Sequence, residues 1–395
     1  MMSKMLELYL HIPFCVRKCA YCDFLSFSAS EMDRNAYVIK LCKQIRAAGK
    51  ETENQKVSTI FFGGGTPSVL NEYQIQLLMD AVFSSFDVDN NAEISMEMNP
   101  GSLAKGYEET ERLLGYRKAG INRVSIGLQS VHQKELQILG RIHTWEQFVQ
   151  SYHCVRNAGF SNINIDLMSA LPEQTEELWE ESLRKTADLK PEHISAYSLI
   201  VEEGTPFYER YTGKGAVFLP DEETERMMYE RTKQILEEYG YYRYEISNYA
   251  QKGKECRHNI GYWTGEEYLG LGLGASSYYK GMRFCSTSDM KRYMQADFLK
   301  DSGAVYEEKH IVTYQEAIEE FMFLGLRMMK GVSAEEFQKR FGRTIEETYG
   351  KILDMFITMN LMEKSQEKNG IYYRLTENGI SVSNQVMCEF IDPQE

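Results

Sequence analysis

The sequence predicts an α/β fold built on a parallel sheet and followed by a smaller helical domain. Three observations support this prediction. Short strand-like runs alternate with helix-like segments up to about residue 205, polar residues gather at the ends of the strand-like runs, and the alternation stops after that point. Alternation of this kind requires parallel strands joined by right-handed crossovers, in a sheet that is either open or curled into a barrel.

Six runs of apolar and β-branched residues predict the parallel strands. Polar residues and glycines stand at or just past the carboxyl end of most runs, which is the edge where parallel α/β folds place their sites. We therefore expect these end residues to share one face of the fold. The six predicted strands span 7–14, 57–64, 92–99, 122–129, 162–169 and 193–200.

Five segments between these strands carry apolar residues at three- and four-residue spacing, which predicts amphipathic helices. Glycine follows or closes three of them, and we interpret Gly49, Gly120 and Gly159 as helix-ending residues. The five predicted helices span 33–50, 72–86, 108–120, 144–160 and 175–190.

The region after residue 205 follows a different order. It contains a charged helix at 221–240, a β-like segment at 241–250 and a glycine-rich strand at 268–279. From about residue 306 the pattern predicts helices, a small hairpin and a last helix, an order that resembles a winged-helix unit. We therefore predict three parts, namely 1–205, 206–305 and 306–395.

Composition narrows the class of protein. The net charge is −14, and no run is rich in lysine and arginine, which argues against a nucleic-acid partner. We apply the same conclusion to the C-terminal unit, although it resembles a winged helix. No apolar stretch is long enough to span a bilayer, and the N-terminus is interpreted as a strand, so we expect a cytoplasmic protein. Eight cysteines in 395 residues are too few for a disulfide scaffold, and clustered cysteines then indicate metal binding or catalysis.

Three of the cysteines, Cys15, Cys19 and Cys22, stand close together in CVRKCAYC. Thiolates at such spacing bind zinc or an iron–sulfur cluster. Structural zinc normally takes four protein ligands, and the chain has no second C-x-x-C. Three thiolates suit a 4Fe–4S cluster in which one iron stays open for a small molecule.

CVRKCAYC resembles the C-x3-C-x2-C signature of the radical S-adenosylmethionine (SAM) superfamily, with Tyr21 at the aromatic position. The resemblance implies a partial (β/α)6 barrel, a 4Fe–4S cluster and SAM bound through the open iron. It assigns SAM binding to strand-end residues whose chemistry fits a ligand with ammonium, carboxylate and ribose groups. These residues are Tyr9, Tyr21, Gly64, Gly65, Thr66, Glu97, Gln129, Arg141 and Asp166.

Further motifs place the chain within that superfamily. LYLHIPFC, FFGGGTPS, EMNPG, SIGLQS and IDLMSALPEQT are similar to the branch that contains oxygen-independent coproporphyrinogen III oxidase and the HemW-type heme chaperones. The oxidases carry a further cysteine two residues after the third, where this chain has Phe24. Since phenylalanine cannot replace a thiol, this position favours the chaperones.

HNIGYW, His258 to Trp263, resembles the H-N-x-x-Y-W motif that is linked to heme in the chaperone group. A neutral imidazole is a standard ligand of heme iron, and Tyr262 and Trp263 offer flat apolar surfaces to a porphyrin. Without the motif, a hydrogen-bonded structural histidine would be the more common interpretation of His258. GLGLGASS (270–277) lacks the context of a dinucleotide site, so we expect close backbone packing there.

We therefore expect a protein that binds heme and delivers it to hemoproteins, which the resemblance implies are those of respiration, and that is not primarily an enzyme. The alternatives are a coproporphyrinogen III oxidase and another radical SAM enzyme. The expected cofactors are a 4Fe–4S cluster, SAM and heme. A heme donor, a homodimer and peripheral membrane association are further possible interactions.

Overall fold

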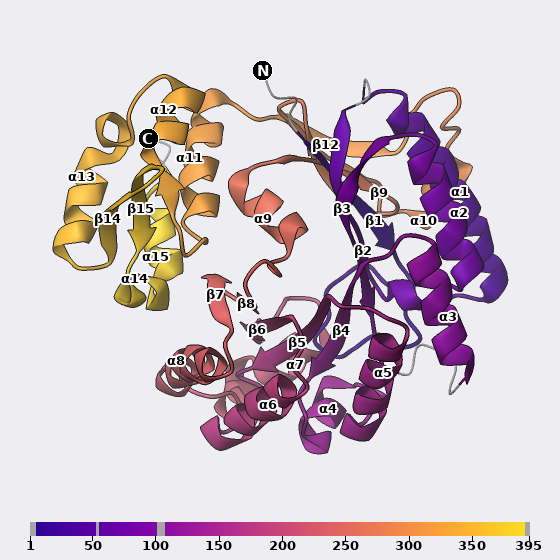
Figure 1. Cartoon of the computed structure of the whole chain (residues 1–395), viewed down its shortest axis with the longest axis horizontal. Coiled ribbons are helices and arrows are strands. Elements are labelled where there is room, and N and C mark those ends of the chain that lie inside the picture. The colour runs from indigo at the N-terminus through magenta and orange to yellow at the C-terminus, as the bar shows by residue number, and fades with distance from the viewer. Residues whose placement is uncertain (1–4, 53–54, 101–106, 392–395) are drawn as a thin grey trace.

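The computed structural model describes residues 5–52, 55–100 and 107–391, and its main body is one twelve-stranded sheet (Figure 1). The strand order is β12-β11-β10-β9-β1-β2-β3-β4-β5-β6-β8-β7. Strands β1 to β6 are neighbours in sequence order, and each pairs with the next in parallel. The predicted α/β fold with six parallel strands is confirmed.

Each of the six central strands agrees with a predicted one, although β3 begins at Asp87 and not at 92. Strand β1 is buried at nearly every position, as expected for a parallel strand that is covered on both faces. The six strands are β1 (Leu6–Ile12), β2 (Lys56–Gly64), β3 (Asp87–Met98), β4 (Arg123–Gln129), β5 (Ile163–Ser169) and β6 (His193–Ser198).

The five predicted crossover helices are also present, and a short helix that we did not predict, α4 (Gln133–Leu139), follows β4. A 3-10 turn, η1 (Pro67–Val69), follows β2. The predicted helices are α1 (Glu31–Gly49), α2 (Glu72–Phe83), α3 (Tyr107–Lys118), α5 (Trp145–Asn157) and α6 (Glu176–Asp188).

Two of the three glycines that we interpreted as helix ends take the left-handed conformation. Gly120 has φ 110° and Gly159 has φ 88°. Gly49 also ends its helix as predicted, since it is the last residue of α1, but the right-handed Lys50 caps the helix and no left-handed glycine follows. A Cβ on Gly49 would lie 2.4 Å from the carbonyl oxygen of Ser85, so close packing is what requires a glycine there.

The segment after β6 adds helices and a hairpin to one edge of the sheet. Strand β8 pairs with β6 in antiparallel fashion, and β7 lies outside it. The HNIGYW motif, to which we assigned neither helix nor strand from the sequence, lies within helix α9. The elements are α7 (Pro206–Tyr211), η2 (Gly213–Phe218), α8 (Glu222–Glu238), β7 (Tyr242–Glu245), β8 (Asn248–Ala250) and α9 (Arg257–Thr264).

The chain then extends the opposite edge of the sheet, where β9 pairs in parallel with β1. The predicted single strand at 268–279 is wrong, since a turn with positive φ at Gly272 and Gly274 divides it. Because β12 belongs to this sheet, the predicted boundary at 305 falls just before its last strand; the boundaries stay a prediction. The elements are β9 (Glu267–Leu271), β10 (Ser276–Tyr279), β11 (Met282–Ser286), α10 (Met290–Gln295) and β12 (Tyr306–Ile311).

The C-terminal part has its own apolar core and a three-stranded sheet, β13-β15-β14. Helix α9 lies between this part and the large sheet (Figure 1). None of the helices in the described ranges is long and apolar enough to cross a membrane. The elements are α11 (Tyr314–Gly325), β13 (Val332–Ser333), α12 (Ala334–Phe341), α13 (Ile345–Thr358), β14 (Met362–Glu367), β15 (Gly370–Leu375), α14 (Glu377–Ser381) and α15 (Ser383–Cys388).

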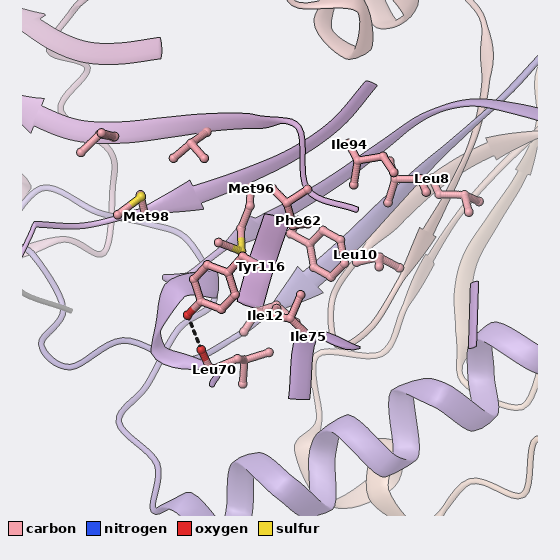
Figure 2. Packing of buried hydrophobic residues seen from close by; sticks show 14 of the residues in the cluster. Leu8, Leu10, Ile12, Phe62, Leu70, Ile75, Ile94, Met96, Met98 and Tyr116 are labelled. Atoms are coloured by element: carbon pink, nitrogen blue, oxygen red, sulfur yellow. Dashed lines mark hydrogen bonds between the residues drawn. The ribbon is translucent and has the colours of Figure 1, made fainter. Parts of the chain in front are cut away.

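Apolar side chains from the strands and the outer helices form the main core (Figure 2). Leu10 of β1, Phe62 of β2 and Ile75 of α2 are completely buried there. Tyr116 of α3 is buried as well, and its hydroxyl donates to the carbonyl of Leu70 at 2.5 Å. This packing holds the strands rigidly, so the loops at their carboxyl ends have a fixed base.

Candidate functional site

The cysteines lie in the loop that follows β1. The N–H of Cys15 donates to the carbonyl of Phe27 at 3.0 Å, which closes the loop on itself. Two contacts join it to other strand ends. Cys15 Sγ lies 3.4 Å from Thr66 Oγ1, and Arg141 Nη1 donates to Cys19 Sγ at 3.6 Å. The loop is therefore held over the carboxyl ends of the parallel strands.

Cys15, Cys19 and Cys22 are free thiols, and all three line one cavity of about 140 Å³. In the described part of the chain, no three His, Cys, Asp or Glu side chains converge closely enough for a single metal ion. A 4Fe–4S cluster binds each thiolate through a different iron, so its ligands stand farther apart than those of zinc. This donor set fits the cluster better than a tetrahedral zinc ion.

Eight of the nine residues predicted to bind SAM line the same cavity as the cysteines. The ninth, Tyr9, borders a neighbouring and larger cavity, where its hydroxyl lies 3.1 Å from His11 Nδ1. The fold thus gathers residues from five strand ends around one space, and their contact with SAM stays a prediction. The eight are Tyr21, Gly64, Gly65, Thr66, Glu97, Gln129, Arg141 and Asp166.

The glycines after β2 allow two backbone segments to touch. The N–H of Gly65 donates to the carbonyl of Ile12 at 2.9 Å, and a Cβ on Gly65 would lie 2.7 Å from the carbonyl oxygen of Phe14. Gly64 has φ 110°, and a Cβ there would overlap the ring of His11. Side chains at these positions would push the cysteine loop away from β2.

Two buried carboxyl groups give the cavity its electrostatic character. Glu97 accepts from the N–H of Gly64 at 3.2 Å, and burial, with the charge of Asp166 adding, raises the pKa of Glu97 to about 8. Asp166 accepts from Ser125 Oγ at 2.9 Å and from Asn164 Nδ2 at 2.7 Å. Burial also raises the pKa of Asp166. Such a pair favours a ligand that carries positive charge.

Arg141 is the cation of this cavity. Its Nη2 donates to the carbonyl of Gly127 at 2.7 Å and to Gln129 Oε1, and its Nε is sealed from solvent without a partner in the described structure. Gln129 has φ 67°, a conformation that residues other than glycine rarely adopt and that is often found at functional sites. These contacts orient a guanidinium that can pair with a carboxylate.

Sequence reasoning missed several residues of this cavity, among them Asn99 and Tyr197. Asn99 Nδ2 donates to Thr66 Oγ1 at 2.8 Å, and Tyr197 belongs to β6. Both stand at or near the carboxyl end of a strand. Their position at a strand end was therefore the feature of the sequence that could have identified them as site residues.

Helix α9 presents His258 to the larger cavity, which has a volume of about 660 Å³. His258 Nδ1 lies 2.7 Å from Thr59 Oγ1, and Nε2 lies 2.9 Å from Tyr262 Oη. The imidazole stacks on Phe61 with ring centroids 5.1 Å apart. Burial, with the charge of Arg123 adding, lowers the pKa of His258 to about 3. The ring is therefore neutral near pH 7, the state that can ligate iron.

The two aromatic residues of the motif also border this cavity. The ring of Tyr262 contacts Tyr268 edge to face, with centroids 4.7 Å apart. The guanidinium of Arg327, from the C-terminal part, lies over the ring of Trp263 at 4.4 Å. Since Tyr262 occupies Nε2 of His258, this hydroxyl must move before the nitrogen can bind a metal.

The two cavities adjoin one another. Gly64, Glu97, Asp166 and Phe24 border both of them. Phe24 is 57 % exposed, so it borders both cavities from the surface and does not belong to the core. A ligand beside His258 would therefore lie next to the space that the cysteines border.

The glycine-rich segment 270–277 serves mainly for close packing. A Cβ on Gly270 would lie 2.1 Å from the carbonyl oxygen of Ser276, and one on Gly272 would approach Tyr37 Oη at 2.6 Å. Gly274 borders the cavity with His258. The expected close approach of backbone is thus present.

Two protein-family models match this chain. The model of the radical SAM superfamily matches residues 9–186, and the model of the HemN C-terminal domain matches residues 312–382. The chain is 36 % identical to heme chaperone HemW of Bacillus subtilis over 97 % of this chain and 98 % of that protein. It is 33 % identical to heme chaperone HemW of Escherichia coli, over 98 % of each chain.

Among solved structures, the chain resembles coproporphyrinogen III oxidase (HemN) from Escherichia coli, described as a radical SAM enzyme. The TM-score is 0.83, the sequence identity is 21 %, and the match covers 98 % of this chain and 90 % of the oxidase. At this identity the likeness establishes the fold alone.

Proposed function

The chain belongs to the HemW heme chaperone family of the radical SAM superfamily, and on this basis we propose that it binds heme and delivers it to hemoproteins. Its cofactors are a 4Fe–4S cluster and SAM. When bound, the cluster supplies one iron that stays open to a small molecule. The residues that would hold these groups are the three cysteines and the eight cavity residues described above.

The main support for heme binding is the position of His258 on the wall of a 660 Å³ cavity. That volume lies within the range of about 300–1,000 Å³ that is usual for cofactor sites. Thr59 holds the Nδ1 side of the ring, so Nε2 is the nitrogen that would reach iron once Tyr262 moves. Tyr262 and Trp263 would then flank the porphyrin.

Phe24 supports a chaperone over an oxidase. It borders both cavities, where the oxidase branch would place a fourth thiol, and it can neither ligate iron nor transfer a proton. With Phe24 at this position, the cavity beside the cluster stays open, but no thiol is present there to ligate iron or to transfer a proton.

Delivery to respiratory hemoproteins and residence in the cytoplasm belong to the same proposal. All eight cysteines are free thiols, which agrees with a reducing compartment. Homodimer formation and peripheral membrane contact are further interactions in this proposal.

The test is anaerobic reconstitution of the cluster, followed by heme titration and by an assay of coproporphyrinogen turnover on the same sample. We expect stoichiometric heme uptake, weaker uptake by His258→Ala, and no decarboxylation. His153→Ala is the matched control, because His153 is exposed on α5 and should leave heme uptake unchanged. Turnover to protoporphyrinogen, or no heme uptake by the wild type, would overturn the proposal.

A further inference from the structure

A buried arginine borders the heme cavity and has no hydrogen-bond partner among the described residues. Arg123, the first residue of β4, is 2 % exposed and lines the same cavity as His258. Its Nε is sealed from solvent and has no acceptor. In the described structure its guanidinium makes no ion pair within 4.0 Å with any carboxylate.

The nearest carboxylates are engaged elsewhere. Glu93 accepts from the N–H of Arg257 at 3.1 Å and from that of His258 at 3.3 Å. Asp166 accepts from Ser125 and Asn164. These carboxylates offset part of the charge of Arg123 at longer range, but Nε of the guanidinium is buried and has no acceptor in the described structure. Burying a cation in this way is costly unless an acceptor joins it.

The missing acceptor is not the carboxylate assigned to Arg141. Arg141 contacts Gln129 at the carboxyl end of β4, whereas Arg123 stands at the amino end of that strand. Six residues of extended chain separate them, which is about 20 Å at 3.3 Å per residue. A ligand of the cysteine cavity that pairs with Arg141 leaves Arg123 unpaired.

We propose that Arg123 is the carboxylate anchor of the heme cavity and pairs with a propionate of the porphyrin whose iron faces His258. This inference rests on the proposed function. A guanidinium can bind a carboxylate through two parallel N–H···O bonds, which fixes the orientation of a flat ligand as well as its affinity. Iron at His258 and a propionate at Arg123 would hold the porphyrin at two points.

The first test compares heme with heme dimethyl ester, which lacks free carboxylates, in anaerobic absorbance titrations. We expect the wild type to bind heme roughly ten- to hundredfold more tightly than the ester, the factor expected for a hydrogen-bonded charge pair. Arg123→Met should lose most of this preference, and Arg123→Lys should retain part of it.

The control is Arg243→Met. Arg243 is 7 % exposed, so its burial is comparable, but it pairs with Glu377 at 2.8 Å and does not border the cavity. We expect this variant to keep the preference for heme. If Arg123→Met also keeps the preference for heme over its dimethyl ester, the role of Arg123 is overturned while the proposed function stands. If the wild type binds neither heme nor the ester, both the proposed function and the role of Arg123 are overturned.

The second test measures thermal unfolding of the protein without heme. Because Arg123 has no partner to lose, Arg123→Met should unfold at the same temperature as the wild type or higher. Arg243→Met should unfold at a lower temperature, since Glu377 loses its partner. A loss of stability in Arg123→Met as large as in Arg243→Met, or failure to fold, would make Arg123 a structural residue and overturn the inference.

Discussion

Burial sets the protonation state of individual residues in the site. Glu97 lies in a dry space beside Asp166, so its carboxyl group keeps a proton up to about pH 8. His258 lies in a similar space but loses its proton, because burial favours the neutral form of either group. Glu97 and His258 are therefore neutral near pH 7 in the site without ligands, and each ionises or binds metal only when a ligand arrives.

This state of Glu97 predicts proton release on SAM binding. If Glu97 pairs with the SAM ammonium, it must ionise, so binding at pH 7 should release about one proton, and the release should vanish well above pH 8. Calorimetry in buffers of different ionisation enthalpy measures the released proton. Glu97→Gln should bind more weakly and release none. Equal heats in all buffers at pH 7 would contradict the role of Glu97.

A second prediction concerns Thr59, whose hydroxyl contacts Nδ1 of His258. Partners of the second ring nitrogen orient a ligating histidine, and their loss commonly costs 10–100-fold in affinity. In Thr59→Val we expect heme affinity to fall by about tenfold and the Soret band to shift. The control is Thr186→Val, an equally buried threonine whose hydroxyl has no partner in the described structure. An unchanged spectrum in Thr59→Val would argue against His258 as the ligand.

At the scale of elements, the site depends on how closely two loops approach. The cysteine loop after β1 rests on the glycines after β2, and the carbonyl of Phe14 occupies the space of a Cβ on Gly65. Backbone atoms cannot move aside as a side chain tip can. The placement of the three thiols is therefore coupled to the end of a neighbouring strand.

Gly65→Ala should thus separate the loop from β2. We expect a folded protein that retains less than half the iron of the wild type after anaerobic reconstitution, measured by iron content and by charge-transfer absorbance. Gly350→Ala is the control, because no atom lies within 4 Å of its would-be Cβ in α13. That change should leave iron content alone and stabilise the helix by about 0.5–1 kcal/mol. Full iron content in Gly65→Ala would contradict the coupling.

At the scale of the whole molecule, the C-terminal part contacts the heme motif. Arg327 lies over Trp263 at 4.4 Å and approaches Glu245 at 4.0 Å, and Arg340 donates to the carbonyl of Gly265 just after α9. Helix α9 thus connects the two parts, and a change in either part can reach the wall of the heme cavity.

Arg327→Ala should therefore weaken the junction. Loss of a partly buried cation–π contact predicts a fall of roughly 1 kcal/mol in the free energy of unfolding, together with weaker heme binding. Denaturant unfolding followed by tryptophan fluorescence, and heme titration, measure the two effects. Arg343→Ala removes a similar contact with Tyr314 inside the C-terminal part and should spare heme binding. Equal heme affinity in Arg327→Ala and wild type would show that the junction does not shape the cavity.

The sequence by itself determined the parallel strands, the five crossover helices, the three thiols and the strand ends that share a cavity. These features depend on local periodicity and on the rule that parallel strands end on one side. Phe24 and HNIGYW were equally visible, since each is a short contiguous pattern.

Only the tertiary structure decided which residues pack against each other, which cavity a residue borders and which polar groups lack partners. Gly49 ends its helix as predicted, but the reason for a glycine there was hidden, because the carbonyl that packs against it belongs to Ser85, which lies far away in sequence. The division of the strand at 268–279 and the position of Tyr9 on the second cavity were likewise hidden. Arg123 carries no motif, and its significance lies in the acceptors that it lacks. Burial and hydrogen-bond partners arise from residues brought together by folding, so no local pattern can specify them.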